Sequence, residues 1–277
     1  MEKIGVSLHV GTLLNTPETE AQAALQKEYG GAAALLAYLR REGVCSIEVR
    51  NVREHMPVAQ SVAAIRAVHE AGLGASVHIA FEERTGREYA ARVRTMIDEA
   101  LRGQERVVFT LHPLKNDGET AARYADWAAA LHEYDGRCRL ALENMRVLKP
   151  DAGHNRIARV AQNIRSAPEA ARGVCWDMGH YAYNIVTLGL PAETCPVRDI
   201  LGQVIHTHIH SLHHPELDTH FPLQRTNEPV KSYLAALRAA GYQGIYNIEL
   251  EPERYIRVMS PRAGMEQTVS VLKEWLE

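Results

Sequence analysis

The sequence predicts an α/β protein with a single domain, residues 1–277, folded as a (β/α)8 barrel. Eight short apolar runs recur along the chain, and an amphipathic segment rich in Ala, Leu and Arg follows each of them. No linker or low-complexity stretch separates these units. The alternative is a doubly wound open sheet, which usually carries a glycine-rich phosphate turn after its first strand. Here HVGTLLN stands at that place with one glycine, so the barrel is favoured.

Turn signals mark the boundaries of several expected elements, such as REG before Val44 and GYQG before Ile245. The expected strands are Ile4–His9, Val44–Arg50, Ala75–Ala80, Arg106–His112, Arg139–Glu143, Gly173–Asp177, Gln203–His210 and Ile245–Leu250. The expected helices are Glu18–Arg41, Val58–Ala71, Arg87–Arg102, Glu119–Tyr134, Asn155–Ser166, Val197–Leu201, Val230–Ala240 and Gly264–Leu276. Gly30 and Gly31 should break the first helix into two pieces.

The overall composition is that of a soluble globular protein, with 46% hydrophobic and 23% charged residues. A net charge of −3 offers no basic surface for nucleic acid, and no apolar run approaches the length of a membrane helix. The four cysteines include no CxxC pair and suit reduced thiols. The N-terminus enters strand-like sequence without a signal peptide, so we expect a cytoplasmic protein.

The most unusual stretch is QVIHTHIHSLHHPELDTHFPL, residues 203–223. If its first part is a strand, the period of two places His206, His208 and His210 on one face, where buried imidazoles need partners or an ion. Further His residues and Asp218 follow in a segment without hydrophobic periodicity, which we expect to be a loop. One such histidine would be explained by a hydrogen bond in the core, but six with an aspartate favour metal ligation.

In a (β/α)8 barrel the carboxyl ends of the strands form the active-site mouth. Six consecutive strands of this chain end in His or carboxylate residues: His78, His112, Glu143, Asp177 with His180, His208 with Asp218 and His220, and Glu249 or Glu251. Each alone has an ordinary structural explanation, such as a helix cap. Together they would place repelling carboxylates at one mouth unless divalent cations lie between them. Imidazole and carboxylate ligands suit Mn²⁺, Zn²⁺, Co²⁺, Fe²⁺ or Mg²⁺.

These motifs resemble those of the xylose isomerase-like barrels, which include sugar isomerases, ketose 3-epimerases, inosose dehydratases and endonuclease IV. The likeness extends over nearly the whole chain. In the epimerase branch one divalent ion is held at the ends of strands five to eight, and the resemblance implies that the ligands here are Glu143 in LALEN, Asp177 in WDMGH, His208 in HTHIHS and Glu249 in NIEL. The DxxH spacing of Asp177 and His180 also matches and implies that His180 contacts substrate.

The sequence is also similar to endonuclease IV, a family that binds three zinc ions. This resemblance adds five candidate ligands: His78, His112, His180, Asp218 and His220. The surroundings differ, because HVGTLL, HIAFEER, HIHSLHH and PLQRTNEPV stand where that family has its DNA-facing motifs. The metal ligands are kept while the DNA-reading surroundings are largely missing. We therefore expect one to three ions per chain, with Mn²⁺ and Zn²⁺ ahead of Co²⁺, Fe²⁺ and Mg²⁺.

Three functions fit this reading, and the complete ligand set favours an enzyme. The first is a metal-dependent isomerase or epimerase, or a dehydratase, acting on a small sugar or polyhydroxylated keto compound. The ion would stabilise an enediolate while Glu143 and Glu249 remove and return a proton. The second is an endonuclease IV-like multinuclear phosphodiesterase or phosphatase. The third is a metal-binding barrel without catalysis. We expect the first.

Five side chains are candidates for contacts with the small-molecule substrate: His180, His112, His9, Glu48 and Arg225. Arg225 could hold an anionic end, although a solvated loop arginine explains it equally well. Glu251 lies two residues past Glu249 on the same face, and the two would exchange roles if the last strand were longer. Nucleic acid and membranes are not expected as partners. Barrels of the family that the sequence resembles often form dimers or tetramers.

Overall fold

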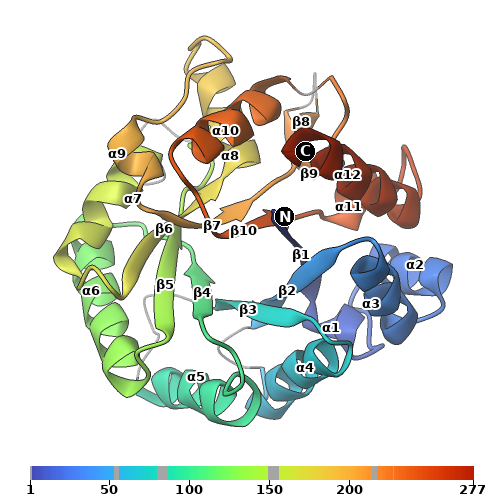
Figure 1. The fold of residues 1–277 in the computed structure, drawn as a ribbon, viewed down its shortest axis with the longest axis horizontal. Helices are drawn as coiled ribbons and strands as arrows, with labels where there is room; N and C mark the ends of the chain where they lie inside the picture. The colour runs from blue at the N-terminus through green and yellow to red at the C-terminus, as the bar shows by residue number, and fades with distance from the viewer. Residues whose placement is uncertain (1, 53–55, 80–86, 149–155, 214–216, 227) are drawn as a thin grey trace.

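Eight parallel strands form one sheet inside a ring of helices in the computed structural model, which describes residues 2–52, 56–79, 87–148, 156–213, 217–226 and 228–277 (Figure 1). The sheet order is β10-β1-β2-β3-β4-β5-β6-β7. The strands are β1 Lys3–His9, β2 Val44–Val52, β3 Gly74–Ile79, β4 Val107–Leu111, β5 Cys138–Glu143, β6 Arg172–Asp177, β7 Val204–His208 and β10 Ile245–Ile248. The predicted barrel and its eight strand positions are confirmed.

The barrel closes where the last strand meets the seventh. Ile209 donates its backbone N–H to the carbonyl of Asn247 at 2.8 Å, and Glu249 donates to the carbonyl of Ile209 at 3.1 Å. The pairing of β6 with β7 contains a bulge, since Val174 pairs with Val204 and Cys175 already with His206. His206 and His208 are two residues apart and therefore share the face toward the barrel interior, where both lie close to Glu48 on β2.

The helices surround the sheet and cover its apolar outer face. They are α1 Val10–Leu13, α2 Glu20–Tyr29, α3 Ala32–Arg41, α4 Val58–Glu70, α5 Arg87–Ala100, α6 Asp117–Tyr134, α7 Ile157–Asn163, α8 Met178–Thr187, α9 Arg198–Leu201, α10 Glu228–Ala239, α11 Pro252–Tyr255 and α12 Pro261–Leu276. The predicted break after α2 is confirmed: Gly30 and Gly31 have φ of +85° and +106°, which glycine adopts without strain. None of the helices in the described ranges has the length and apolarity to cross a membrane.

Local sequence explains where several helices begin. The side chains of Thr19, Asn116 and Ser260 accept hydrogen bonds from backbone N–H groups in the first turns of α2, α6 and α12. The packing between sheet and helices is apolar and aromatic. Trp176 of β6 packs against aromatic side chains, and its ring centroid lies 5.6 Å from those of Tyr181 and Tyr233.

Besides the short helices α1 and α11, which the sequence analysis does not contain, two differences from the predictions lie at the carboxyl ends of the strands. Met178–Thr187 forms helix α8 directly after β6, where the sequence analysis places only Val197–Leu201. The segment expected to be a loop after β7 contains a small antiparallel hairpin, β8 Ser211–His213 with β9 Asp218–Phe221. Leu217 and His220 have φ of +56° and +63° there. The hydrophobic pattern did not indicate this hairpin. Its backbone depends on two non-glycine residues with positive φ, a conformation that is uncommon for such residues and is not expected from the sequence.

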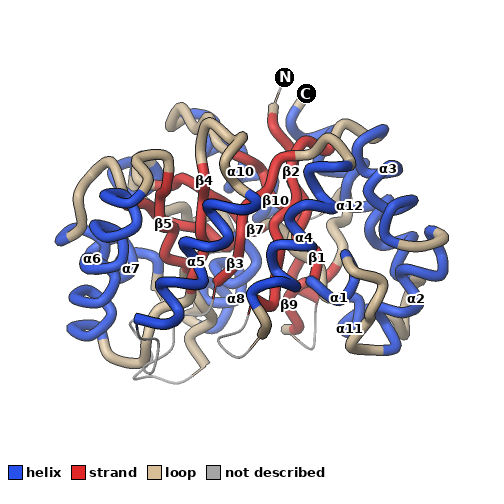
Figure 2. The backbone as a smooth tube through the Cα atoms, turned by 90° about the horizontal axis from the view of Figure 1, so that it is seen from below, coloured by secondary structure: helices blue, strands red, loops and turns tan. Residues whose placement is uncertain are grey.

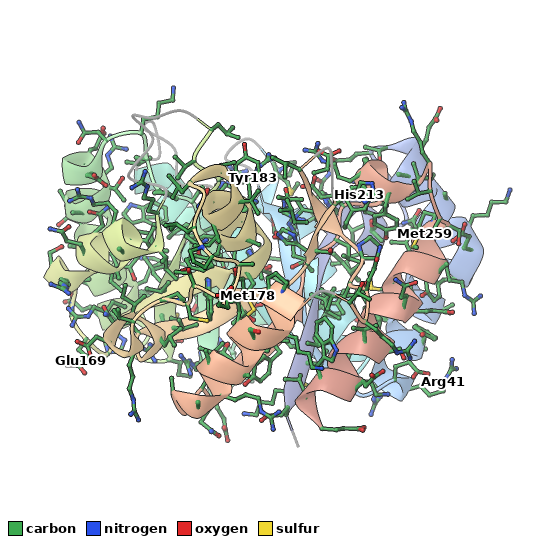
Figure 3. The ribbon with its side chains drawn as sticks, turned by 90° about the horizontal axis from the view of Figure 1, so that it is seen from above. Arg41, Glu169, Met178, Tyr183, His213 and Met259 are labelled. Carbon is green, nitrogen blue, oxygen red and sulfur yellow. The ribbon has the colours of Figure 1, made fainter. Side chains whose placement is uncertain are left out.

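The two ends of the barrel are distinguished by the residues and chain termini that lie there. Figure 2 shows both chain termini at one end, with β9, α1 and α11 toward the other. In Figure 3, Tyr183 and His213 lie at the end where the strands finish, whereas Glu169 and Arg41 lie at the opposite end. The end with Tyr183 and His213 is called the mouth below, and the opposite end is called the floor.

Candidate metal centre

Four side chains from four different strand ends meet at the centre of the mouth. Glu143 ends β5, Asp177 ends β6, His208 ends β7, and Glu249 directly follows β10. Each offers one ligand atom, and these atoms all lie within 4.8 Å of one another. Nδ1 of His208 is 3.3 Å from Oε2 of Glu143, 3.3 Å from Oε2 of Glu249 and 3.8 Å from Oδ2 of Asp177. The structure thus brings together the four residues that the epimerase resemblance implies.

A second cluster adjoins the first on the side of β3 and β4. Nε2 of His78 lies 3.2 Å from Oε2 of Glu143, and Nε2 of His112 lies 3.5 Å from the same oxygen. The rings of the two histidines are in edge contact, with centroids 4.7 Å apart. His112 is about half exposed, so this cluster opens toward solvent. Glu143 is therefore shared by two groups of candidate ligands.

A third cluster lies on the side of α8 and the β8–β9 hairpin and consists of His180, His210 and His220. Nδ1 of His180 is 3.1 Å from Oδ2 of Asp177, and Nε2 of His210 is 3.0 Å from its Oδ1. His220 approaches the central cluster, with Nδ1 at 3.4 Å from Oε2 of Glu249. All three imidazoles are buried. His210 was not among the predicted ligands.

The central residues are held in charged forms by their surroundings. Burial favours the neutral form of Glu143, but the charge of His208 keeps the pKa of this carboxyl well below its usual range. Burial has the same effect on Glu249, and it is outweighed by Arg50, whose Nη2 lies 3.0 Å from Oε1 of Glu249. Burial likewise opposes the charged form of His208, but the negative groups around it raise its pKa well above the ordinary value.

A divalent cation fits this arrangement. Nδ1 of His208, Nδ1 of His220 and Oε2 of Glu249 are buried, and none of them forms a hydrogen bond with the described residues. They nevertheless face one another at 3.3 to 3.4 Å. Buried polar atoms rarely stay without partners, and atoms that converge without hydrogen-bond geometry suit ligation instead. Imidazole nitrogen and carboxylate oxygen are donors that zinc and manganese accept.

Glu48 does not take the place that the sequence suggested. Its carboxylate is fully buried below the central cluster rather than exposed to substrate. It accepts hydrogen bonds from Ser7 Oγ at 2.6 Å, His208 Nε2 at 2.9 Å and Asn247 Nδ2 at 3.2 Å. All three donors contact the same oxygen, Oε2, so the structure shows Glu48 engaged by protein groups, and the predicted substrate contact stays a prediction. Glu48 orients His208, as carboxylates beside metal-binding imidazoles commonly do.

Three other predicted residues lie away from the centre. Asp218 starts β9 and is well exposed, and its nearest described charged partner is Arg254 at 3.5 Å, so it is not part of any of the three clusters. Arg225 is exposed and forms an ion pair with Glu274 at 2.8 Å on α12. His9 ends β1 and is not among the described residues that line the mouth cavity. The structure therefore does not bring Asp218 or Arg225 into the central cluster, where the sequence analysis expected a ligand and an anion contact.

Sequence reasoning missed two residues that shape the mouth. Arg50 of β2 lies 3.0 Å from Glu249 and 3.6 Å from Glu251. Asn144 follows β5 and holds Asp177 by two hydrogen bonds to its backbone, both of 2.9 Å. Arg50 stands two residues past Glu48 in the same strand, so the period of two could have indicated it. Glu251 pairs with Arg50 at the rim, which leaves Glu249 as the strand-eight member of the cluster.

The mouth contains a cavity of about 380 Å³ above the central cluster. Polar and charged side chains make up most of its lining: Arg50, His112, Glu143, Arg146, His180, His220, Glu249, Glu251 and Arg254. Pro113, Met145 and Leu148 contribute apolar surface on one side. This volume lies near the lower end of the range of about 300 to 1,000 Å³ for ligand pockets. The cavity therefore suits a small, polar molecule.

The family profile described as "Xylose isomerase-like TIM barrel" matches residues 36–275. No curated protein sequence matches the chain. Among solved structures, a sugar phosphate isomerase/epimerase from Parabacteroides distasonis superposes with a TM-score of 0.60 at 16% sequence identity, covering 98% of this chain and 93% of that one.

Two further structures cover the whole barrel. The IolI protein with a binding zinc atom has a TM-score of 0.59 at 14% identity, covering 98% of each chain. The 3-keto-D-glucoside 4-epimerase YcjR from E. coli has a TM-score of 0.57 at 14% identity, covering 99% of this chain and all of that one. At these identities the likeness establishes the fold.

Proposed function

Because the chain belongs to the xylose isomerase-like TIM barrel family, we propose that it is a divalent-metal-dependent isomerase or epimerase. Its substrate would be a small sugar or a related polyhydroxylated carbonyl compound. The observation that carries the proposal is the convergence of Glu143, Asp177, His208 and Glu249 beneath an open polar cavity. The IolI protein, whose structure contains zinc, and the two isomerases or epimerases with similar folds support it.

Glu143, Asp177, His208 and Glu249 would hold the ion, and a bound ion would polarise a substrate carbonyl and stabilise the negative charge that develops on its oxygen. Glu143 and Glu249 are the proton carriers in this proposal. They enter the cavity from β5 and from the end of β10, and both line it. Their lowered pKa values keep both carboxylates ionised at neutral pH, as a general base requires. One would remove a proton from carbon. The other, ionised in the resting protein, would take up a proton from solvent before it returns one to carbon.

Substrate hydroxyls would be held by side chains at the cavity wall. His112 and His180 line the cavity on opposite sides of Glu143. Nη1 of Arg50 is buried and makes no hydrogen bond with the described residues, although Nη2 is engaged by Glu249. That N–H group is suited to donate to a carbonyl or hydroxyl oxygen of a bound sugar.

A second candidate function is hydrolysis of a small phosphate ester at a multinuclear centre. The observation in its favour is that the clusters around His78 and His210 flank the central one and share its carboxylates. Two or three bound ions would lower the pKa of the attacking water and stabilise the negative charge on the leaving oxygen. Against it stands Asp218, which pairs with Arg254 instead of joining a cluster. The first function uses only the central cluster and is preferred.

Metal content separates the two candidates. We expect about one tightly held divalent ion per chain in the purified protein, kept in His78→Ala and His220→Ala and lost in His208→Ala. His132→Ala on α6 is the control, because this histidine bonds the carbonyl of Cys138 far from the mouth. Two or three ions, with a loss in each of the first two variants, would favour phosphoester hydrolysis. A protein that retains no divalent ion would refute both functions.

Proton transfer is the second test of the isomerase proposal. Incubation with a panel of ketoses in deuterium oxide should place deuterium on the carbon beside the carbonyl. Glu143→Gln and Glu249→Gln should abolish this exchange, whereas His132→Ala should keep it. Exchange that persists in both glutamine variants would remove these residues from the proton-transfer step.

A further inference from the structure

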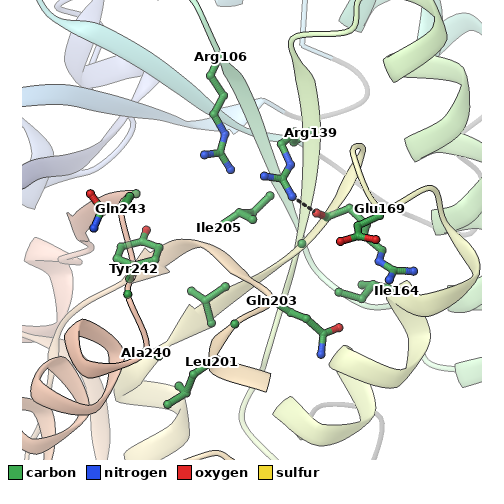
Figure 4. Close-up of a pocket in the computed structure, with 16 residues that line it drawn as sticks. Arg106, Arg139, Ile164, Glu169, Leu201, Gln203, Ile205, Ala240, Tyr242 and Gln243 are labelled. Atoms are coloured by element: carbon green, nitrogen blue, oxygen red, sulfur yellow. Dashed lines mark hydrogen bonds between the residues drawn. The ribbon is translucent and has the colours of Figure 1, made fainter. Parts of the chain in front are cut away.

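The floor of the barrel contains a second cavity, of about 250 Å³, at the amino ends of the strands. It lies at the opposite end from the mouth, and Figure 4 shows the side chains that surround it. Arg106 precedes β4 and Arg139 belongs to β5, the neighbouring strand. Ile205 of β7 and Tyr242 before β10 line other sides of the cavity. Neither arginine has a role in the proposed reaction, so the cavity needs its own explanation.

The two arginines bring like charges together. Their guanidinium groups are directed into the same space in Figure 4. Arg139 donates from Nη2 to the carbonyl of Arg172 at 2.6 Å, but its Nε is buried and has no hydrogen-bond partner among the described residues. Arg106 forms neither a hydrogen bond nor an ion pair with the described residues. The cavity therefore presents several N–H donors that the described part of the chain does not satisfy.

No described carboxylate forms an ion pair with either arginine, although the charge of Glu169 favours the charged form of Arg139. Glu169 also lines the cavity, but it forms no ion pair within 4 Å with a described arginine. Tyr242 cannot serve as an acceptor for the charge in the way a carboxylate does, and its hydroxyl donates to the carbonyl of Ile245 at 2.8 Å. Arg172 also lines the cavity, but its Nη1 is engaged by the carbonyls of Arg165 and Ala167 at 2.6 and 3.0 Å.

The charged forms of both arginines are disfavoured at this place. Burial lowers the pKa of Arg106, and burial together with the charge of Arg106 lowers the pKa of Arg139. An arginine that is buried beside a carboxylate shows the opposite shift, as Arg50 does at the mouth. The floor thus brings an exposed and a half-buried arginine together without a carboxylate in ion-pair contact with either among the described residues.

We propose that the floor cavity binds a small oxyanion of the phosphate class. The forked guanidinium groups of Arg106 and Arg139 would donate to two or more of its oxygens, a geometry in which arginine recognises phosphate. The volume supports a small ligand, because about 250 Å³ lies below the range of about 300 to 1,000 Å³ typical of drug-sized molecules. The site is independent of the metal centre and of the reaction at the mouth.

Inorganic phosphate is the probe that tests the proposal. The melting temperature and the heat of binding are measured at constant ionic strength, with chloride replaced stepwise by phosphate. The wild-type protein should show a saturable rise in melting temperature. Arg106→Gln should weaken phosphate binding about tenfold or more, since a charge-assisted hydrogen bond is lost. Arg106→Lys should lie between the two, because lysine keeps the charge without the fork.

The same variants distinguish the floor from other places where phosphate could bind. Without phosphate, Arg106→Gln should be at least as stable as wild type, because the repulsion with Arg139 is removed. Arg225→Gln is the matched control: it removes an exposed arginine, paired with Glu274, far from the floor, and should keep the full phosphate effect. A phosphate effect that is absent in wild type, or unchanged in Arg106→Gln, would overturn the proposal. So would acetate acting as strongly as phosphate, since the site would then be a carboxylate site.

Discussion

Replacement of Glu48 by Gln tests whether the charge of this buried carboxylate makes His208 a stronger metal ligand. An ionised carboxylate only accepts hydrogen bonds, so the contact at 2.9 Å means that Nε2 of His208 carries a proton. An ion that displaces the other proton of the charged ring would therefore bind at Nδ1, the atom that faces Glu143 and Glu249 at 3.3 Å. The glutamine side chain would be similar in shape and could still accept at one oxygen, but it would lose the charge that makes His208 a strong ligand.

The expected loss follows from the position of Glu48 behind a ligand. Changes in residues that orient metal-binding imidazoles cost about 10- to 100-fold in metal affinity, or about 1.4 to 2.8 kcal/mol. We expect the lower end for Glu48→Gln, because Ser7 and Asn247 can still donate to its remaining oxygen. Glu48→Ala should reach the upper end and also lower the stability, because it leaves buried donors without an acceptor.

Competition against a chromogenic chelator at about pH 8.5, well above the usual histidine pKa of about 6.5, gives the zinc affinity with little interference from protons. Ser7→Ala is the matched control, since it removes one donor to Glu48 and keeps the carboxylate; its affinity should change less than threefold. Circular dichroism of the metal-free proteins checks the fold. A folded Glu48→Gln protein with wild-type zinc affinity would show that Glu48 does not act through His208.

Two further predictions concern packing and charge. In Gly179→Ala the new Cβ would fall 1.9 Å from Cε1 of His210, so we expect a lower melting temperature, whereas Gly136→Ala, with no heavy atom within 4 Å, should not change it. Asp135→Asn removes the partner of the Arg137 Nε, 2.9 Å away, which together with that arginine's other contacts lowers the pKa of Asp135. The stabilisation from the Asp135–Arg137 contact, about 1 kcal/mol or less, is present above the unfolded pKa of about 3.9 and is lost as pH falls through the lower folded pKa. Urea melts of wild type and Asp135→Asn should therefore differ near neutrality and converge at acid pH.

The fold and the centre of the site were predictable from the sequence for physical reasons. Strands that are buried on both faces appear as short apolar runs between turn signals, and the position just after such a run lies at the mouth. That rule alone locates Glu143, Asp177 and His208. It does not depend on side-chain detail, because the carboxyl ends of parallel strands must meet at one end of a barrel.

The remaining residues depend on features that a pattern does not contain. The period of two gives the face of Glu48 but not its depth, and depth decides whether the carboxylate meets substrate or supports His208. The left-handed backbone of His220 turns its ring inward while Asp218 stays at the surface. Arg225 was placed by charge alone, and the position of α12, which brings Glu274 to it, arises from tertiary packing.

Glu143 contacts all three groups of imidazoles, through His78 and His112 on one side, His208 in the centre and His180 on the other. One carboxylate has only two oxygens, and any rotation that improves its contact with one group alters its contact with the others. Binding of an ion at the central cluster would therefore be linked, through a single side chain, to whatever the flanking imidazoles bind, and this linkage is reciprocal. In a titration of the metal-free protein, any ion beyond the first should follow it at higher metal concentration and should not fill an independent, equivalent site.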